Sequence, residues 1–346
     1  MRRISIHIIL LVAVGLLTAC NGMGKKGTGE PIRISGEAQG TYYSIIYYDE
    51  QQRNLQDEIK AFLDEFDKTA SLWVENSMLR HVNENKDSVV NETFAELLRL
   101  STEMNSFTEG NFDCTVGKLV NAWGFGFEKR EEVSDATIDS LLQYTGRQPQ
   151  IVRDKQGRLI VRKPFAETSF DFNAIAQGYT TDKICQLLES KGITNYLVDI
   201  GGEIYAKGTK PDGKKWVVGI ERPAENKYSS REIETSIELS GMSVVTSGSY
   251  RKYYEKDGER YSHTIDPKTG RPVEHTLLSV SVIDTASWRA DALATAFMVM
   301  GLEKSLDFIK RHPDDTGTQA VFFIYTENGE YKTYATQGFA RFMNND

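Results

Sequence analysis

The chain has 346 residues, a formal net charge of −8, 40% hydrophobic residues and 26% charged residues. These values are typical of a soluble globular protein that forms one large domain or two ordinary ones. Because the net charge is negative and no basic stripe emerges along the chain, the composition argues against a nucleic-acid partner.

The N-terminus carries a pattern typical of an export signal. Arg2 and Arg3 precede an apolar run that ends in Leu17-Thr18-Ala19-Cys20. This run is short and is followed by polar residues, so it predicts a signal peptide at 1–19 rather than a membrane-spanning helix. Its last four residues resemble a bacterial lipobox, which implies cleavage before Cys20 and lipidation of its thiol. An ordinary signal peptide followed by a chance cysteine is the alternative.

The residues after the signal peptide are predicted to form a short tether and a folded domain. Residues 20–31 are rich in Gly and Lys and are predicted to form a flexible tether. We therefore expect a lipoprotein anchored to a membrane on its periplasmic side, with one folded domain at residues 32–346. Cys114 and Cys185 are expected to be buried thiols, because two lone cysteines do not make a disulfide framework.

Hydrophobic periodicity predicts helices and strands that are interspersed along the folded part. Helices are predicted at 55–66, 94–104, 175–190 and 290–301. Strands are predicted at 41–48, 196–200, 216–220, 277–283 and 321–325, with a hairpin at 151–161. This mixture places the fold in the α/β or α+β class.

Residues 262–272, with the sequence Ser-His-Thr-Ile-Asp-Pro-Lys-Thr-Gly-Arg-Pro, are the most informative stretch of the chain. Asp266-Pro267 with Gly270 predicts a fixed turn, because Pro presets φ and Gly tolerates positive φ. His263 precedes this turn, which makes the segment a candidate site element. A surface hairpin turn explains the same residues equally well.

The helix predicted at 290–301 contains a second candidate site. Asp291 and Thr295 are four residues apart, so both project from one face of an otherwise apolar helix. A carboxylate in such surroundings is costly unless it is paired or bound to a metal, and a carboxylate with a hydroxyl suits a hard cation such as Mg²⁺. The alternative is an Asp that complements the dipole of its own helix, with Thr295 bonded back to a carbonyl.

Two further segments could contact a ligand. Residues 171–179 open a helix with small residues, and the amides at a helix start favour anions. An Asp or Asn N-cap explains them as well. Residues 111–119 precede Trp-Gly-Phe-Gly at 123–126, where aromatic rings and glycines could hold a planar ring or form a structural cluster.

Taken together, in this order and spacing, eight segments resemble the ApbE family of FAD:protein FMN transferases. They extend through most of the chain after the tether, and as an ordered set they are specific although each is short. The segments are 36–41, 71–77 with Asn83, 112–117, 171–179 with Asp182, 201–203, 246–250, 263–272 and 290–295.

The resemblance implies an ApbE-like fold with a flavin-nucleotide cleft. It also implies Mg²⁺-dependent transfer of the FMN moiety of FAD to a Ser or Thr hydroxyl of an exported acceptor protein, with release of AMP. Asp291 and Thr295 match the family's metal-binding side chains, and Ala174 matches its main-chain oxygen ligand. His263, with an ordinary pKa of about 6.5, is the side chain expected to orient or deprotonate the acceptor hydroxyl. The residues that match the nucleotide-lining positions are Gln39, Trp73, Asn111, Phe112, Asp113, Ala174, Gln177, His263 and Ile265.

The chain departs from the usual family pattern near the expected nucleotide site. Gln39 stands where Met is common, Gln177 stands where Lys or Glu is common, and Cys114 and Lys118 stand where Pro is common. No Ser/Thr-Gly-Ala-Ser/Thr acceptor motif occurs in the chain, so the acceptor is expected to be another protein. Two other functions stay open: an Mg²⁺-dependent FAD pyrophosphatase that yields FMN and AMP, and a non-enzymatic FAD-binding lipoprotein.

Overall fold

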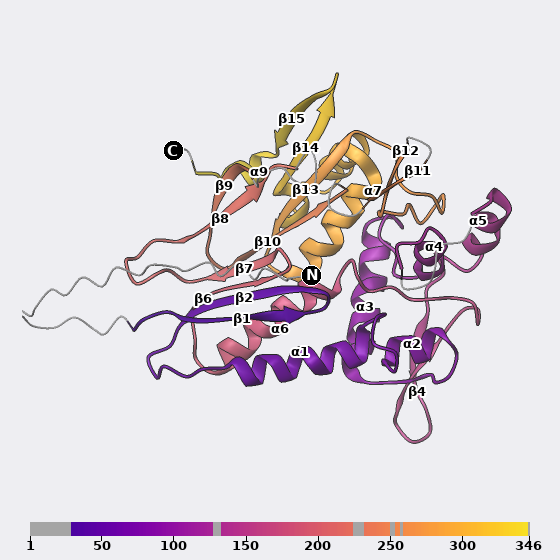
Figure 1. Ribbon diagram of the computed structural model, residues 1–346, viewed down its shortest axis with the longest axis horizontal. Coiled ribbons are helices and arrows are strands. Elements are labelled where there is room, and N and C mark those ends of the chain that lie inside the picture. Colours follow the sequence, from indigo (N-terminus) through magenta and orange to yellow (C-terminus); the bar gives the residue numbers. More distant parts are fainter. Residues whose placement is uncertain (1–28, 127–132, 224–231, 250–252, 257–258, 345–346) are drawn as a thin grey trace, which may run out of the picture.

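The structure is a computed structural model that describes residues 29–126, 133–223, 232–249, 253–256 and 259–344 (Figure 1). The predicted signal peptide at 1–19, Cys20 and most of the predicted tether lie outside the described residues. Among the helices that fall within these ranges, none has the length and apolar composition of a membrane span.

An eight-stranded antiparallel sheet organises the domain (Figure 1). Each strand pairs antiparallel with its neighbours, and helices interrupt the series of strands in sequence, so the predicted mixed α+β class is confirmed. In spatial order the strands are β1 (Ile32–Ala38), β2 (Thr41–Tyr48), β6 (Asn195–Ile200), β7 (Glu203–Lys207), β10 (Met242–Gly248), β13 (Leu277–Asp284), β14 (Val321–Glu327) and β15 (Glu330–Ala335).

The two faces of this sheet are buried against different elements. Val321 and Phe323 of β14 face the helices, and the Phe323 ring lies 6.1 Å from that of Phe297. Phe322, the residue between them, points to the opposite face and stacks on Phe339 at 5.2 Å, as the period-2 geometry of a strand requires. The helical side comprises α1 (Gln56–Ala70), α3 (Glu92–Phe107), α6 (Ala176–Ser190) and α7 (Ser287–Arg311); the other side comprises β8 (Trp216–Glu221), β9 (Ile233–Leu239) and α9 (Gln337–Ala340).

Smaller elements extend the domain beside the helices (Figure 1). A three-stranded sheet has the order β3-β5-β4, and β11 pairs with β12 just before His263. The bounds of these elements are α2 (Met78–Asn83), β3 (Val89–Val90), α4 (Gly117–Ala122), α5 (Asp135–Leu142), β4 (Gln150–Arg153), β5 (Leu159–Arg162), β11 (Tyr253–Lys256), β12 (Glu259–Ser262) and α8 (Thr316–Gln319).

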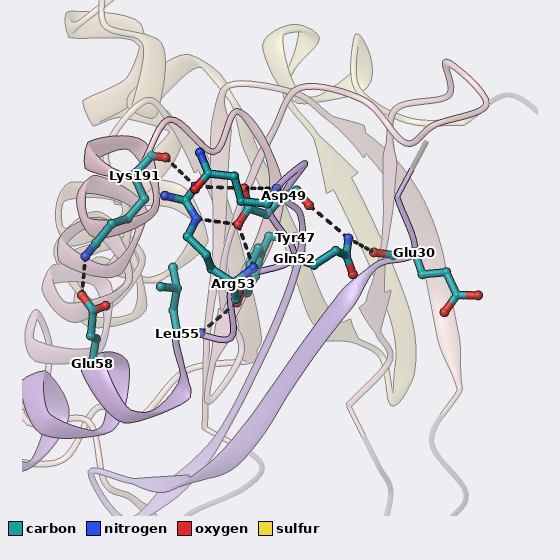
Figure 2. A network of polar contacts seen from close by, with 9 residues as sticks. Glu30, Tyr47, Asp49, Gln52, Arg53, Leu55, Glu58 and Lys191 are labelled. Atoms are coloured by element: carbon teal, nitrogen blue, oxygen red, sulfur yellow. Dashed lines mark hydrogen bonds and ion pairs between the residues drawn. The ribbon is translucent and has the colours of Figure 1, made fainter. Parts of the chain in front are cut away.

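A polar network ties the N-terminal hairpin to the end of α6 (Figure 2). The Arg53 guanidinium donates to both oxygens of Asp49 at 2.7 and 2.8 Å and to the carbonyl of Lys191 at 2.7 Å. Lys191 in turn forms an ion pair with Glu58 at 2.6 Å. The hydrogen bond from Arg53 lowers the pKa of Asp49 to about 2.

Every helix and strand that periodicity predicted is present, and Cys114 and Cys185 are buried free thiols as expected. The boundaries of α7 differ most from the prediction, because it continues past residue 301 to Arg311. Gly301 adopts φ 73° and ψ 174° and interrupts the helix there. Periodicity does not predict several other strands, among them β10 and β15, whose Ser, Thr, Lys and Glu residues hide the apolar alternation.

Candidate active site

Asp291 lies on α7 with its side chain turned toward the start of α6. The residue is 5% exposed and is surrounded by fully buried apolar neighbours. Its Oδ2 accepts a hydrogen bond from the Gly178 amide at 3.1 Å. Burial raises the pKa of Asp291 to about 7, and repulsion by Asp182 acts in the same direction. The alternative that Asp291 complements its own helix is therefore wrong, because it faces the N-terminus of another helix.

Thr295 follows Asp291 by one helical turn. Its Oγ1 lies 3.4 Å from the hydroxyl of Ser247 at the end of β10. Within α7, all of which the structure describes, no hydrogen bond joins this hydroxyl to a carbonyl, contrary to the alternative. Asp291 and Thr295 thus present a carboxylate and a hydroxyl from one helix face, as predicted. Ser247 had been matched only as part of a motif, and its contact with Thr295 depends on the packing of β10 against α7.

The start of α6 differs from the sequence prediction. The helix begins at Ala176, its N-cap is Ile175, and no side chain of the capping residue closes it. Asp171 instead accepts a hydrogen bond from the Asn173 amide at 2.8 Å in a turn before the helix, so the alternative of an Asp or Asn N-cap is wrong. The Gly178 amide donates to Asp291 and not to the Ala174 carbonyl, which releases that carbonyl from the helical hydrogen-bond pattern.

Gln39 contacts α6, and Gln177 lies beside the turn between β6 and β7. Gln39 has a positive φ of 53° in the β1–β2 turn, and its Nε2 donates to Thr180 of α6 at 3.0 Å. A Cβ added to Gly201 would lie 2.9 Å from Gln177 Nε2. Within the described ranges the buried Oε1 of Gln39 has no hydrogen-bond partner, which marks it as an acceptor available to a ligand.

Residues 111–113 form the loop after α3. The Phe112 ring is 2% exposed and belongs to the core. Asp113 accepts hydrogen bonds from the Thr115 amide and hydroxyl at 2.7 and 2.6 Å, and burial raises its pKa. The carbonyl of Cys114 accepts from the Asp171 amide at 2.7 Å. The side chains of Phe112 and Asp113 therefore shape this loop, and the Cys114 bond places it beside the segment that leads into α6.

The predicted turn after His263 is confirmed. Gly270 has φ 69°, and its amide donates to the Asp266 carbonyl at 2.8 Å. The indole of Trp123 donates to the Gly270 carbonyl at 2.8 Å, and Ile265 packs on Trp123 in a small apolar cluster. This bracing favours a site element over a loose surface turn.

The same loop also contacts the segment after α3. Lys268 Nζ donates to Asn111 Oδ1 at 3.1 Å, and the His263 ring packs edge-on against Phe125 with 6.3 Å between centroids. The structure thus joins the predicted residues in two neighbouring groups, one around the start of α6 and one around the His263 loop. Trp73 stands apart from the buried members of both groups, because it is 64% exposed in the loop between α1 and α2.

Two surface cavities lie outside these groups. One of about 440 Å³ is lined by residues of α2 and β5 and the loops beside them, and one of about 700 Å³ lies between α3 and the β4–β5 hairpin. Neither contains a predicted site residue.

The donor set fits a hard divalent cation. It combines the Asp291 carboxylate, the Thr295 hydroxyl and the released Ala174 carbonyl, which are oxygen ligands of the kind that Mg²⁺ prefers. Over the described residues there is no cluster of three or more His, Cys, Asp and Glu side chains that could hold a metal.

Comparison with known proteins identifies the family. The ApbE family model matches residues 39–322. The FAD:protein FMN transferases of Salmonella typhimurium and Vibrio cholerae are 33% and 35% identical to the chain, covering 98% and 96% of it and 97% and 98% of their own lengths. The solved structure of the flavin transferase ApbE from Vibrio cholerae matches with a TM-score of 0.77 at 34% identity, over 90% of this chain and 99% of that one.

A second solved structure, the apo form of the flavinyl transferase ApbE from Pseudomonas stutzeri, matches with a TM-score of 0.78 at 33% identity. It covers 92% of this chain and 98% of its own. The predictions of an enzyme and of an ApbE-like fold are thereby confirmed. The chain belongs to the ApbE family.

Proposed function

We propose that the chain transfers the FMN moiety of FAD to a Ser or Thr hydroxyl of an exported acceptor protein and releases AMP. Family membership and the names of the relatives support the reaction. The observation that carries the proposal is the Asp291 carboxylate, which is buried; among the described residues its hydrogen-bond donor is the Gly178 amide alone. A cation on FAD phosphates would offset the cost of burying this carboxylate.

In this proposal Asp291, Thr295 and the Ala174 carbonyl hold Mg²⁺. The ion, when bound, neutralises charge on the phosphates and supplies Lewis-acid polarisation. Asp291 serves this purpose with Oδ1, because its Oδ2 already accepts from Gly178. Gln39 Oε1 and Gln177 offer polar contacts to the nucleotide in this proposal.

The transfer is an in-line displacement at the phosphorus of the FMN moiety. The acceptor oxygen forms a bond to this phosphorus while the bond to the bridging oxygen of the AMP moiety breaks, and AMP leaves with that oxygen. His263 takes the proton of the acceptor hydroxyl in this proposal. The bracing of its loop by Trp123 and Lys268 supports the role, because a general base must be held in position.

One experiment tests the reaction. Protein comprising residues 32–346 is incubated with FAD, Mg²⁺ and an acceptor that carries a Ser/Thr-Gly-Ala-Ser/Thr motif, and AMP and covalently bound flavin are measured. Equal amounts of both are expected. AMP without labelled acceptor would replace the proposal with FAD pyrophosphatase activity, and neither product, with FAD bound, would replace it with flavin binding alone.

Asp291 provides the sharpest variant test of the metal site. Asp291→Asn retains an oxygen that can accept from Gly178 but loses the negative charge, so Mg²⁺-dependent AMP release should fall by at least about 100-fold. Asp291→Ala should abolish it. Circular dichroism checks that both variants fold, and Asp64→Asn, an exposed acid on α1, is the matched control. AMP release at the wild-type rate in Asp291→Asn would remove the metal assignment.

A further inference from the structure

Helices α6 and α7 approach each other closely at their N-terminal ends. A Cβ added to Gly178 would lie 2.4 Å from the main-chain oxygen of Ser287 and 2.8 Å from the Cα of Trp288. Neither helix is closed by its own capping residue, because the N-caps Ile175 and Ala286 form no side-chain cap hydrogen bond. The buried amides at both starts therefore need acceptors from elsewhere.

Each helix supplies the acceptor for the other. Asp182 of α6 accepts from the Ser287 amide with Oδ1 at 2.9 Å and from the Trp288 amide with Oδ2 at 3.0 Å. Asp291 of α7 accepts from the Gly178 amide at 3.1 Å. The two carboxylates thus form a reciprocal cap, in which each helix caps the start of the other. Asp291, one of the two capping residues, is also a candidate metal ligand.

We propose that Asp182 is a positioning residue for the metal site, which it serves by fixing the first turn of α7. This inference rests on the function proposed above. Asp291 and Thr295 are the fifth and ninth residues of α7, so their directions depend on the rotation and position of the turn that Asp182 holds. The reciprocal bond from Gly178 to Asp291 turns the carboxylate toward α6 and releases the Ala174 carbonyl beside it.

The chemistry of Asp182 explains why a carboxylate is needed there. The two oxygens of Asp182 accept from two different main-chain amides, those of Ser287 and Trp288. An Asn side chain at this position has one oxygen that can accept and one NH₂ group that can only donate. Asp182→Asn therefore leaves one buried amide of α7 facing a donor. Outer residues that orient a metal ligand typically change metal affinity by about 10- to 100-fold when replaced.

The test measures metal binding and nucleotide binding separately. Mn²⁺ is titrated into wild-type protein and Asp182→Asn, each saturated with FAD, and unbound Mn²⁺ is followed by electron paramagnetic resonance. FAD affinity is measured by flavin fluorescence in EDTA. We expect the Kd for Mn²⁺ to rise by at least about tenfold in Asp182→Asn, with the Kd for FAD changed by less than about threefold.

Two further variants separate positioning from general loss of stability. Asn91→Ala removes the side-chain cap of α3, which accepts from Phe94 at 2.9 Å, and should lower the melting temperature without weakening Mn²⁺ binding. Asp182→Glu retains both acceptor oxygens but shifts them by one methylene, so its Kd for Mn²⁺ should lie between those of wild type and Asp182→Asn. If Asp182→Asn does not fold, Asp182→Glu decides alone.

The outcomes distinguish this inference from the proposed function. Wild-type Mn²⁺ affinity in Asp182→Asn, or in Asp182→Glu when it is the deciding variant, would overturn the positioning role and leave the transferase proposal intact. Weakening by the same factor in Asn91→Ala would also overturn it. A wild-type protein that binds FAD but no Mn²⁺ would overturn the metal assignment itself.

Discussion

The Asp291 carboxylate has two oxygens with different surroundings. Oδ2 accepts from the Gly178 amide, and Oδ1 is the oxygen that we propose for the cation. His263 precedes a loop with a fixed conformation. The Gly270 amide donates to the Asp266 carbonyl, and the Trp123 indole donates to the Gly270 carbonyl. In the proposed reaction, Asp291 supplies negative charge to the metal site and His263 accepts a proton.

His263 is expected to act on the proton of the acceptor and not on FAD affinity. His263→Ala and His263→Gln should both lower the rate of flavin transfer by at least about 100-fold, because neither side chain can take a proton near neutral pH. The Kd for FAD should change by only a few fold in fluorescence titrations. His81→Ala, on α2, is the control and should transfer at the wild-type rate. Near-normal transfer by His263→Ala would contradict the assignment.

At the scale of elements, the α6–α7 pair creates the candidate metal site. Glycine at 178 permits the close approach, and the reciprocal cap aligns the two helix starts. Strand β10 adds Ser247 behind Thr295. The ligands therefore come from elements that pack together only in the folded domain.

Gly178→Ala tests this packing. An alanine inside a helix normally stabilises by about 1 kcal/mol relative to glycine, but a Cβ here would meet the Ser287 oxygen at 2.4 Å and force the helices apart. We expect a net loss of about 1–3 kcal/mol in the free energy of unfolding, measured with urea. Mn²⁺ affinity should fall as well. Ser190→Ala, at the exposed end of α6, should cause no such losses, and a stabilised Gly178→Ala protein would refute the close contact.

At the scale of the whole molecule, contacts distant in sequence hold the domain together. The network around Arg53 connects β2 with the end of α6 at Lys191 (Figure 2). The main-chain hydrogen bond from the Asp171 amide to the Cys114 carbonyl connects the loop after α3 with the segment that precedes α6. These links join segments that are more than 50 positions apart in the sequence.

Asp49 makes the stability of this arrangement depend on pH. Its pKa is about 2 in the folded protein and 3.8 as an ordinary Asp. The stabilisation is therefore complete above about pH 4 and is lost as pH falls through 2.

Asp49→Asn should lower the free energy of unfolding by about 1–3 kcal/mol at pH 7, and its difference from wild type should shrink between about pH 4 and 2. Urea titrations across this range provide the measurement. A constant difference down to pH 2 would exclude the Asp49–Arg53 pair as its source.

Local sequence patterns predicted much of the fold. The helix over 175–190 and the strand over 196–200 follow from periodicity, and the turn at 266–270 follows from its Pro and Gly. The family and the reaction it suggests follow from ordered motifs. The polar strand β10 escaped prediction because Ser and Thr do not reveal which of its faces is buried.

The sequence alone determined which residue types are available for chemistry and which stretches fold locally, because both depend on neighbours a few positions apart. Tertiary structure decided that Asp291 caps α6, that Asp182 caps α7 and that Ser247 lies beside Thr295. Asp182 and Ser287 are 105 positions apart. A hydrogen bond between residues so distant in sequence cannot be predicted from local periodicity. Only the packing of α6 on α7 brings the carboxylates to the amides that need them.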